Sequence, residues 1–392
     1  MFDKTALQAE MLSVLQENIL AFWLDKMVDT ERGGFYGRMT ADGRIDADAP
    51  KGAILNARIL WAFSAAYRAT GREDYLAAAS RAMRYLIDRF YDHEHGGVYW
   101  SLTADGEPLD TKKQFYALGF AIYGLSEYVR ATGDDEALRY AVALYDDIEQ
   151  HSRDRRFGGY IEALTRDWQP IDDMRLSDKD RNDRKSMNTH LHIIEPYTNL
   201  LRVWRNDELL ESVCSLLDVF EKHIVDPETF HLRLFFDDEW NSTSEMISYG
   251  HDIEASWLLH ETALVVGDAA LIEHFGALAR RIADAAAEGL QSDGSMIYEY
   301  DASAGHRDTD RHWWVEAECV VGYFNIWEHF GDSLALERSL ATWNYIKANL
   351  LDRSGGEWWW SVDESGCVNS RDDKAGFWKC PYHNSRMCLF FL

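Results

Sequence analysis

The chain has 392 residues, of which 46% are hydrophobic and 27% charged, a balance typical of folded globular proteins rather than disordered ones. Its 67 acidic and 40 basic residues give a formal net charge of −27, which argues against nucleic acid, anionic membrane surfaces and polyanionic substrates as partners. No cationic leader precedes an apolar stretch, no apolar run is long enough to cross a bilayer, and the five cysteines lack CxxC spacing. We therefore expect a cytoplasmic protein with reduced thiols.

A segment with two glycines followed by aromatic or apolar residues recurs along the chain. The second glycines of the first three copies, Gly34, Gly97 and Gly159, are spaced by 63 and 62 residues. A fourth tight copy contains Gly355 and Gly356, and looser copies lie near residues 230 and 294. The sequence therefore contains six copies of a repeat of about 63 residues.

A short turn keeps the same period, and each copy is flanked on both sides by helical periodicity. In these turns we expect glycine to end one helix in the left-handed conformation and aspartate to cap the next helix. The turns are Thr70-Gly71-Arg72-Glu73-Asp74, Thr132-Gly133-Asp134, Arg205-Asn206-Asp207, Val266-Gly267-Asp268 and Phe330-Gly331-Asp332.

Each repeat thus consists of a helix, a tight turn, a second helix and a short hairpin. The first helix is almost wholly apolar, as in residues 53–63, whereas the second is amphipathic, with charges at Arg81, Arg84 and Asp88. This difference predicts an inner and an outer ring, that is, an all-α fold in which six helical hairpins form an (α/α)6 barrel with short β-hairpins or loops at one mouth. The alternative is an open solenoid. Length alone suggests two or three domains, but the unbroken repeat predicts one domain over residues 1–392.

A long polar stretch, residues 172–185, interrupts the third repeat. Its mixed charges indicate a solvated loop, and a lid over an active site is the alternative interpretation.

Equivalent positions in a closed barrel converge on one mouth, so polar or aromatic residues near the start of each inner helix are candidates for a common site. These residues are Arg58, Tyr116, His192, His251, Trp314 and His383. Two histidines on different walls could act on opposite faces of one carbon atom, one removing a proton and the other returning it.

The stretch SYGHDIEASW, residues 248–257, is the most informative of these segments. Ser248 is expected to cap a helix and Gly250 to let the chain turn tightly into it. His251 then lies in the first turn, where the helix dipole disfavours the imidazolium and leaves a neutral base. Glu254 lies on the same helix face, within reach of His251 or of a substrate.

Further candidates surround these helices. Only one of His190 and His192 can face the interior, and we expect it to be His192, with Asn188 one turn earlier; a His-x-His metal site is the competing interpretation. The indole rings of Trp314 and Trp378 can stack on a sugar ring. Arg58 lies among apolar residues and therefore needs an anionic partner, either a carboxylate or a sugar oxygen that develops enolate charge. Glu316 and Glu318 are two residues apart and would face different walls, one as a hydrogen-bonding group and one in a structural ion pair.

Five segments resemble the cellobiose 2-epimerases of the N-acylglucosamine 2-epimerase superfamily: KGAILNARILW, NTHLHIIEPYTNL, SYGHDIEASWLL, WWVEAECVVG and WKCPYHNSRMC. The resemblance implies an (α/α)6 barrel. It also implies reversible epimerisation at C2 of the reducing-end glucose of cellobiose, lactose and other β-1,4 disaccharides. One departure is visible, because Gln114 follows Lys113 where the family has histidine.

The resemblance also implies roles for the candidate residues. His251 and His383 resemble the general acid–base pair, and His383 would also assist ring opening. Trp314 and Trp378 resemble stacking platforms. The residues that would hold the open-chain sugar and its cis-enediolate are Arg58, Tyr116, Asn188, His192 and Glu254.

We expect neither a cofactor nor a metal, because the sequence contains no phosphate-binding glycine loop and no dinucleotide fingerprint, and proton transfer needs neither. The expected partner is a neutral disaccharide, and the expected assembly is a monomer or weak homodimer. Three alternatives remain open: an aldose–ketose isomerase or 2-epimerase for monosaccharides of the mannose or N-acylglucosamine type, a glycoside hydrolase with two carboxylates, and a non-enzymatic sugar-binding protein.

Overall fold

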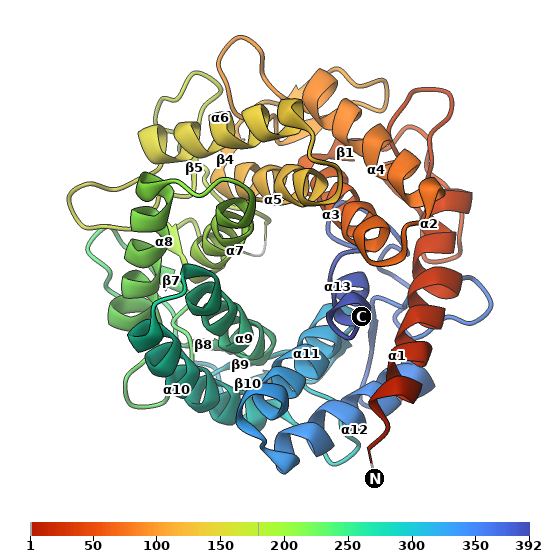
Figure 1. Cartoon of the computed structure of the whole chain (residues 1–392), viewed down its shortest axis with the longest axis vertical. Helices are drawn as coiled ribbons and strands as arrows, with labels where there is room; N and C mark the ends of the chain where they lie inside the picture. Colours follow the sequence, from red (N-terminus) through yellow and green to blue (C-terminus); the bar gives the residue numbers. More distant parts are fainter. Residues whose placement is uncertain (1, 179) are drawn as a thin grey trace.

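The computed structural model describes residues 2–178 and 180–392, and in these residues paired helices follow one another around a ring (Figure 1). The inner helices are α3 (Ala53–Thr70), α5 (Phe115–Thr132), α7 (Met187–Val203), α9 (Tyr249–Val266), α11 (Trp313–Phe330) and α13 (His383–Phe390). The outer helices are α1 (Lys4–Ser13) with α2 (Ala21–Lys26), α4 (Glu73–Tyr85), α6 (Asp135–His151), α8 (Asp207–Val219), α10 (Ala269–Ala286) and α12 (Ser333–Asn349). Short π-helical or 3₁₀ turns continue several of these: η1 (Val14–Leu20), η2 (Leu86–Phe90), η3 (Phe220–Ile224) and η4 (Ala287–Gly289).

The ring is closed. Each inner helix packs against the next one, and α13 packs against both α11 and α3. The predicted (α/α)6 barrel is therefore confirmed and the open solenoid is wrong. No helix in the described residues is long and apolar enough to span a membrane.

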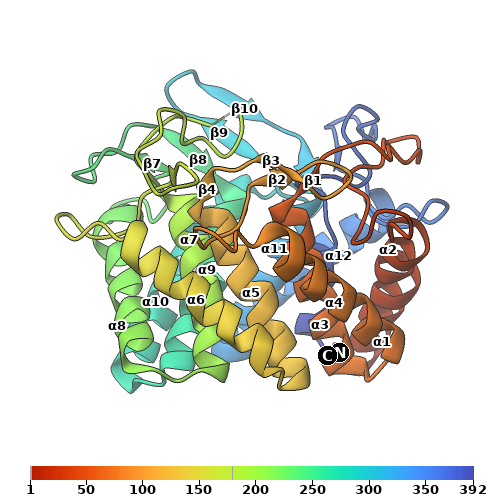
Figure 2. The same ribbon diagram turned by 90° about the horizontal axis from the view of Figure 1, so that it is seen from above.

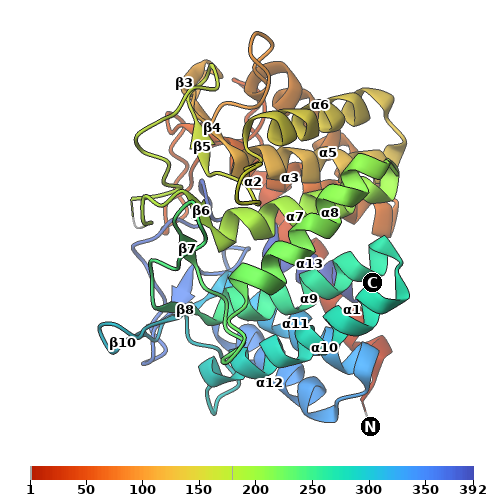
Figure 3. The same ribbon diagram turned by 90° about the vertical axis from the view of Figure 1, so that its left-hand side faces the viewer.

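Short antiparallel strands gather at one end of the barrel, as Figures 2 and 3 show. They pair as β1–β2–β3, β4–β5, β6–β7, β8–β9–β10 and β11–β12. Because β1, β4, β6, β8 and β11 each lead directly into an inner helix, the N-terminal ends of these helices lie at this end. The strands are β1 (Lys51–Gly52), β2 (Ser101–Leu102), β3 (Pro108–Asp110), β4 (Lys113–Gln114), β5 (Ala163–Leu164), β6 (Lys185–Ser186), β7 (Phe235–Phe236), β8 (Met246–Ser248), β9 (Glu299–Asp301), β10 (His306–Asp308), β11 (Arg311–His312) and β12 (Ser361–Val362).

The turns at the opposite end follow the predicted chemistry with three exceptions. Left-handed glycines end four of the inner helices, at Gly71, Gly133, Gly267 and Gly331. Side chains cap four of the outer helices, at Asp134, Asn206, Asp268 and Asp332. The first exception is α7, which ends at Val203 and has Trp204 rather than a glycine at its C-cap. The second is α8, which is capped by Asn206 and not by the predicted aspartate. The third is α4, which follows Arg72 without a side-chain cap, so the aspartate cap predicted for the first turn is also wrong.

The glycine segments form equivalent tight loops, but the last one is shifted by one residue. In the first loop the amide of Gly33 donates to the carbonyl of Asp29, and in the last loop the amide of Gly356 donates to that of Asp352. Gly356 therefore corresponds to Gly33, and the place of the second glycine is taken by Glu357, a non-glycine residue with a φ of 63°.

Buried lysine–aspartate pairs connect the loops of the first three repeats to the inner ring. Lys51, directly before α3, lies 2.8 Å from Asp29 and also donates to the carbonyl of Gly33 at 2.7 Å. The same arrangement recurs for Lys113 with Asp92 at 2.9 Å and for Lys185 with Asp154 at 2.7 Å. Burial opposes ionisation of Asp29, but Lys51 and two backbone amides outweigh it and lower the pKa of that carboxyl. Each pair fixes the start of an inner helix.

We expect Lys51→Met to destabilise the protein by about 3 kcal/mol or more, because it leaves the Asp29 carboxylate buried without its counter-charge. Urea unfolding measures the change. Lys222→Met is the control, since Lys222 pairs with Asp218 at the surface and its loss should have little effect. A stability of Lys51→Met equal to that of the control would contradict the structural role of the pair.

Candidate functional site

The six residues predicted from the inner helices come together at the strand-bearing end of the barrel. Nη2 of Arg58 donates to the Tyr116 hydroxyl at 2.8 Å, and the ring of Tyr116 lies 5.0 Å from that of His192. The ring of Trp314 lies 4.8 Å from His251 and 5.7 Å from the His383 ring. The predicted convergence of these positions is a feature of the structure.

The other three predicted residues lie beside them. Trp378 precedes α13, and its indole is 6.0 Å from the Tyr116 ring. Asn188 lies on α7 and Glu254 on α9, and each has a buried side-chain oxygen without a hydrogen-bond partner. The buried Nε of Arg58 also has no partner. These three polar atoms on predicted binding residues are therefore available to a polar ligand.

Three histidines at this site are held in the same way. Nδ1 of His192 lies 3.0 Å from Glu195, that of His383 lies 2.6 Å from Glu318, and that of His251 lies 2.8 Å from the hydroxyl of Ser248. Within the described residues, Nε2 of each ring makes no hydrogen bond, so each histidine has one nitrogen fixed by the protein and one left for a ligand.

The surroundings of His251 and His383 favour the neutral imidazole ring. Burial, and then the neighbouring His192, lower the pKa of His251 to about 3. Burial together with the guanidinium groups of Arg58 and Arg386 lowers the pKa of His383 well below its usual value. Neutral imidazole is the form that can accept a proton.

His192 faces this site because α7 bends. Its φ of −93° and ψ of 16° interrupt the helix, and Pro196 four residues later has no amide to bond its carbonyl. That carbonyl packs against Gly119 of α5, where a Cβ atom would lie only 2.3 Å from it. His190 serves a structural role instead, since Nδ1 bonds the carbonyl of Ser186 and Nε2 accepts from the amide of Tyr160. A metal site using both histidines is therefore excluded.

A buried guanidinium lies beneath the histidines. Arg386 of α13 donates to Glu254 at 2.7 Å and to Glu318 at 2.6 Å, and it also contacts Glu195 and Tyr382. We did not predict Arg386 or Glu195 from the sequence. The only signal was spacing, because each lies three residues after a site histidine and so on the same helix face.

Glu254 holds its proton more tightly than an ordinary glutamate. Burial and the adjacent Glu318 carboxylate raise its pKa well above the usual value, although Arg386 opposes the shift. Glu318 is the predicted ion-pair residue, while Glu316 accepts the backbone amide of Met296 at 2.9 Å. The two carboxyls therefore face different neighbours, as the sequence indicated.

Two clusters place three potential metal ligands close together in the described residues. Glu254, Glu318 and His383 form one, and Asp308, Asp310 and His312 the other. In the first, Arg386 already supplies the positive charge between the carboxylates, which disfavours a second cation there.

Two local predictions about the start of α9 are wrong. Ser248 stands at the N-cap position, but its hydroxyl bonds His251 and does not cap the helix, which forgoes about 1 kcal/mol. Gly250 lies inside the helix and makes no turn. Its lack of a side chain gives space to Trp314, whose ring a Cβ atom would approach to 2.7 Å.

The long polar stretch, residues 172–185, is hydrogen-bonded to the start of the second inner helix hairpin near β4. Gln114, which replaces the histidine of the resembling family, donates to the carbonyl of Met174 at 3.0 Å, and Lys112 donates to that of Arg175 at 3.0 Å. Met174 and Arg175 thus lie beside β4, whereas Asp183 accepts from the Thr243 hydroxyl at 2.8 Å and Lys185 pairs with Phe236 of β7. Residue 179 lies outside the described part.

Glu162 caps the α7 terminus from the preceding repeat. It accepts the Ser186 amide at 2.8 Å and the Thr189 hydroxyl at 2.6 Å. Burial raises the pKa of this carboxyl to about 8, although both hydrogen bonds oppose the shift.

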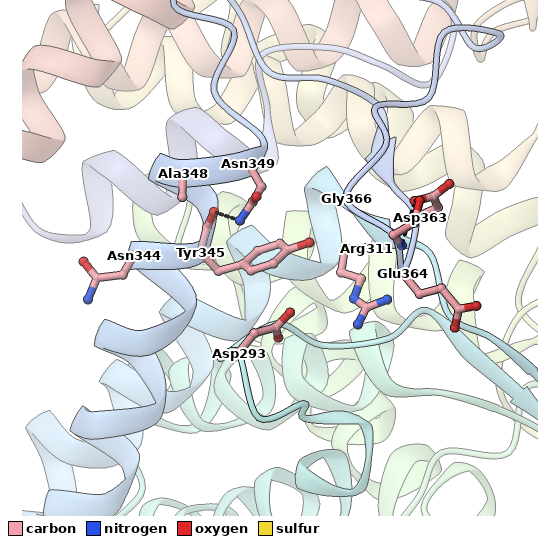
Figure 4. A pocket seen from close by; sticks show the side chains of 10 residues that line it. Asp293, Arg311, Asn344, Tyr345, Ala348, Asn349, Asp363, Glu364 and Gly366 are labelled. Carbon is pink, nitrogen blue, oxygen red and sulfur yellow. Dashed lines mark hydrogen bonds between the residues drawn. The ribbon is translucent and has the colours of Figure 1, made fainter.

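A surface cavity of about 460 Å³ lies elsewhere, between α12 and the turn after β12. Figure 4 shows Tyr345 and Arg311 on its wall together with Asp293 and Asp363. None of the predicted site residues lines it.

Comparisons with protein families, with individual proteins and with solved structures all find sugar 2-epimerases. The family model for N-acylglucosamine 2-epimerase (GlcNAc 2-epimerase) matches residues 34–386. The cellobiose 2-epimerase of Bacteroides fragilis is 60% identical, over 98% of each chain. The cellobiose 2-epimerase structure from Bacillus thermoamylovorans is 40% identical over 99% of each chain, with a TM-score of 0.93. The D-mannose isomerase of Marinomonas mediterranea is 22% identical, over 99% of this chain and 96% of the relative.

We expect Glu162→Gln to change how stability depends on pH. A carboxyl whose pKa is raised on folding holds its proton in the folded state, so wild-type stability falls as pH rises from about 4.5 to 8. Glutamine does not ionise and lacks this loss. Urea unfolding at pH 5 and pH 8 should show the variant gaining more than about 1.4 kcal/mol relative to wild type at the higher pH. Identical pH dependence in both proteins would contradict a raised pKa.

Proposed function

The chain belongs to the N-acylglucosamine 2-epimerase family, and we propose that it is a cellobiose 2-epimerase. The reaction is the reversible conversion of the reducing-end glucose of cellobiose, lactose and other β-1,4 disaccharides to mannose. The observation that carries this proposal is the arrangement of His251 and His383. The surroundings of both rings favour the neutral form, both rings leave Nε2 open, and both lie against the indole of Trp314.

Two imidazoles on different walls suit a reaction in which a proton leaves one face of a carbon atom and returns to the other, one ring acting as a base in its neutral form and the other as an acid once it carries a proton. After the ring of the reducing-end sugar opens, with His383 assisting, one histidine accepts the C2 proton through Nε2. The electron pair of the C2–H bond moves into a C1–C2 double bond, and the carbonyl oxygen at C1 takes up the negative charge. The product of this step is the enediolate. The second histidine acquires its proton when the ring opens, because its Nε2 accepts the O1 hydroxyl proton while water protonates the ring oxygen. After rotation about C2–C3 presents the other face, this imidazolium donates that proton to C2, and the first histidine releases its own proton to water.

Positive charge and hydrogen-bond donors beside the histidines support the enediolate. Arg58 is buried, its guanidinium pairs with no carboxylate in the described residues, and the Tyr116 hydroxyl accepts from it. Charge that develops on a sugar oxygen near Arg58 and His192 would be stabilised more than the neutral ground state. The unpaired oxygens of Asn188 and Glu254 are suited to sugar hydroxyl groups.

The indoles favour an extended substrate. Trp314 and Trp378 lie on different segments of the mouth, and the Trp100 ring lies 6.0 Å from that of Trp378. Flat apolar faces of this kind stack on the C–H faces of sugar rings. The identity to the Bacteroides fragilis cellobiose 2-epimerase supports a disaccharide over a monosaccharide.

An aldose–ketose isomerase is the second candidate, because the same enediolate gives a ketose when the proton returns to C1. The likeness to a D-mannose isomerase favours this alternative. A glycoside hydrolase is less consistent with the site, since the buried carboxylates Glu195, Glu254 and Glu318 share the Arg386 guanidinium.

We expect incubation with cellobiose in D2O to yield glucosyl-mannose that carries deuterium at C2, with or without added chelator. Nuclear magnetic resonance and chromatography locate the label and the product. Deuterium at C1 of a ketose would indicate the isomerase, and free glucose would indicate a hydrolase. Turnover of mannose without turnover of cellobiose or lactose would exclude the disaccharide substrate.

We expect His251→Asn and His383→Asn each to lower kcat by more than about 100-fold, because each removes one partner of the proton transfer. His274→Asn is the control, since His274 lies on the outer helix α10, paired with Glu221. Steady-state kinetics with cellobiose measure the effect. Full activity in either of the first two variants would contradict the two-histidine mechanism.

A further inference from the structure

The serine that begins α9 is used differently from its counterpart on α7. Ser186 stands at the N-cap of α7 and accepts the amide of Thr189 at 3.1 Å. Ser248 stands at the N-cap of α9 with extended backbone, yet it makes no side-chain cap bond. Its hydroxyl lies 2.8 Å from Nδ1 of His251.

We propose that Ser248 is a positioning residue for epimerisation: its hydroxyl accepts the Nδ1 proton of His251 and thereby turns the Nε2 lone pair toward the substrate. The proposal rests on the proposed function, in which His251 exchanges a proton with C2. Ser248 itself touches no reacting atom and acts only through the ring.

The choice of a hydroxyl distinguishes His251 from the other two site histidines. His192 and His383 are held by carboxylates, which stabilise an imidazolium. A hydroxyl fixes the ring without adding a negative charge. The charged or titratable groups that act on His251 from neighbouring helices are His192 of α7 and Glu318 of α11, which have opposite effects. Ser248 therefore orients His251 while leaving it a neutral base.

The remaining surroundings of the ring do not replace this contact. Ser248 is fully buried, and Trp314 packs 4.8 Å from the His251 ring. In the described residues the His251 ring makes no other hydrogen bond. Without the hydroxyl, Nδ1 loses its acceptor, and the tautomer with the proton on Nε2 becomes competitive. That tautomer cannot accept the C2 proton.

The experiment compares Ser248→Ala, Ser248→Thr and Ser186→Ala. We expect Ser248→Ala to lower kcat for cellobiose by about 10- to 100-fold with KM changed less than about twofold. Threonine retains the hydroxyl and should restore most of the rate. Histidine ¹⁵N resonances should show the Nδ1–H tautomer of His251 in wild type and the Nε2–H tautomer in Ser248→Ala.

Ser186→Ala is the matched control. It removes a true helix cap, so it should lower the melting temperature while the His251 tautomer stays as in wild type. If Ser248→Ala retains the wild-type kcat and tautomer while His251→Asn is inactive, the role of Ser248 is wrong and the proposed function stands. If wild type fails to epimerise any sugar, the proposed function is wrong, and the ¹⁵N tautomer still decides whether Ser248 holds the ring.

Discussion

The barrel and its site both depend on the ion pairs between the Arg386 guanidinium and three buried glutamates. It lies buried on the short helix α13 and contacts carboxylates from α7, α9 and α11, namely Glu195, Glu254 and Glu318. A carboxylate left without a counter-charge at this depth costs several kcal/mol. When α13 closes the ring, Arg386 therefore pairs with buried carboxyl groups from three other inner helices at once.

The same carboxylates fix the histidines. Glu195 joins Arg386 to His192, and Glu318 joins it to His383, so two of the three imidazoles are oriented through one buried cation. Glu254 completes the group with a raised pKa, which reduces the negative charge that Arg386 must balance. His251 lies outside this network and is held by the neutral Ser248.

The last repeat supports α13 through Glu357. Glu357 adopts a left-handed conformation in the place of a glycine, and its buried carboxylate accepts from Trp23 at 3.1 Å, Lys379 at 2.6 Å and Asn384 at 2.9 Å. Strain of this kind persists where the surroundings over-determine it. Glu357 thereby connects α2, near the start of the chain, to the segment that carries His383.

The sequence by itself determined the repeat, the two rings of helices, most of the helix caps and the residues at the mouth. These features depend on local spacing: apolar periodicity, a glycine after a helix, and one position per inner helix. It did not determine the partners of those residues. Arg386 is separated from Glu195, Glu254 and Glu318 by 191, 132 and 68 residues. Only ring closure brings them together. The tertiary structure likewise decided that Ser248 serves His251 rather than its helix and that Gly250 gives space to Trp314, because both depend on neighbours that local sequence does not specify.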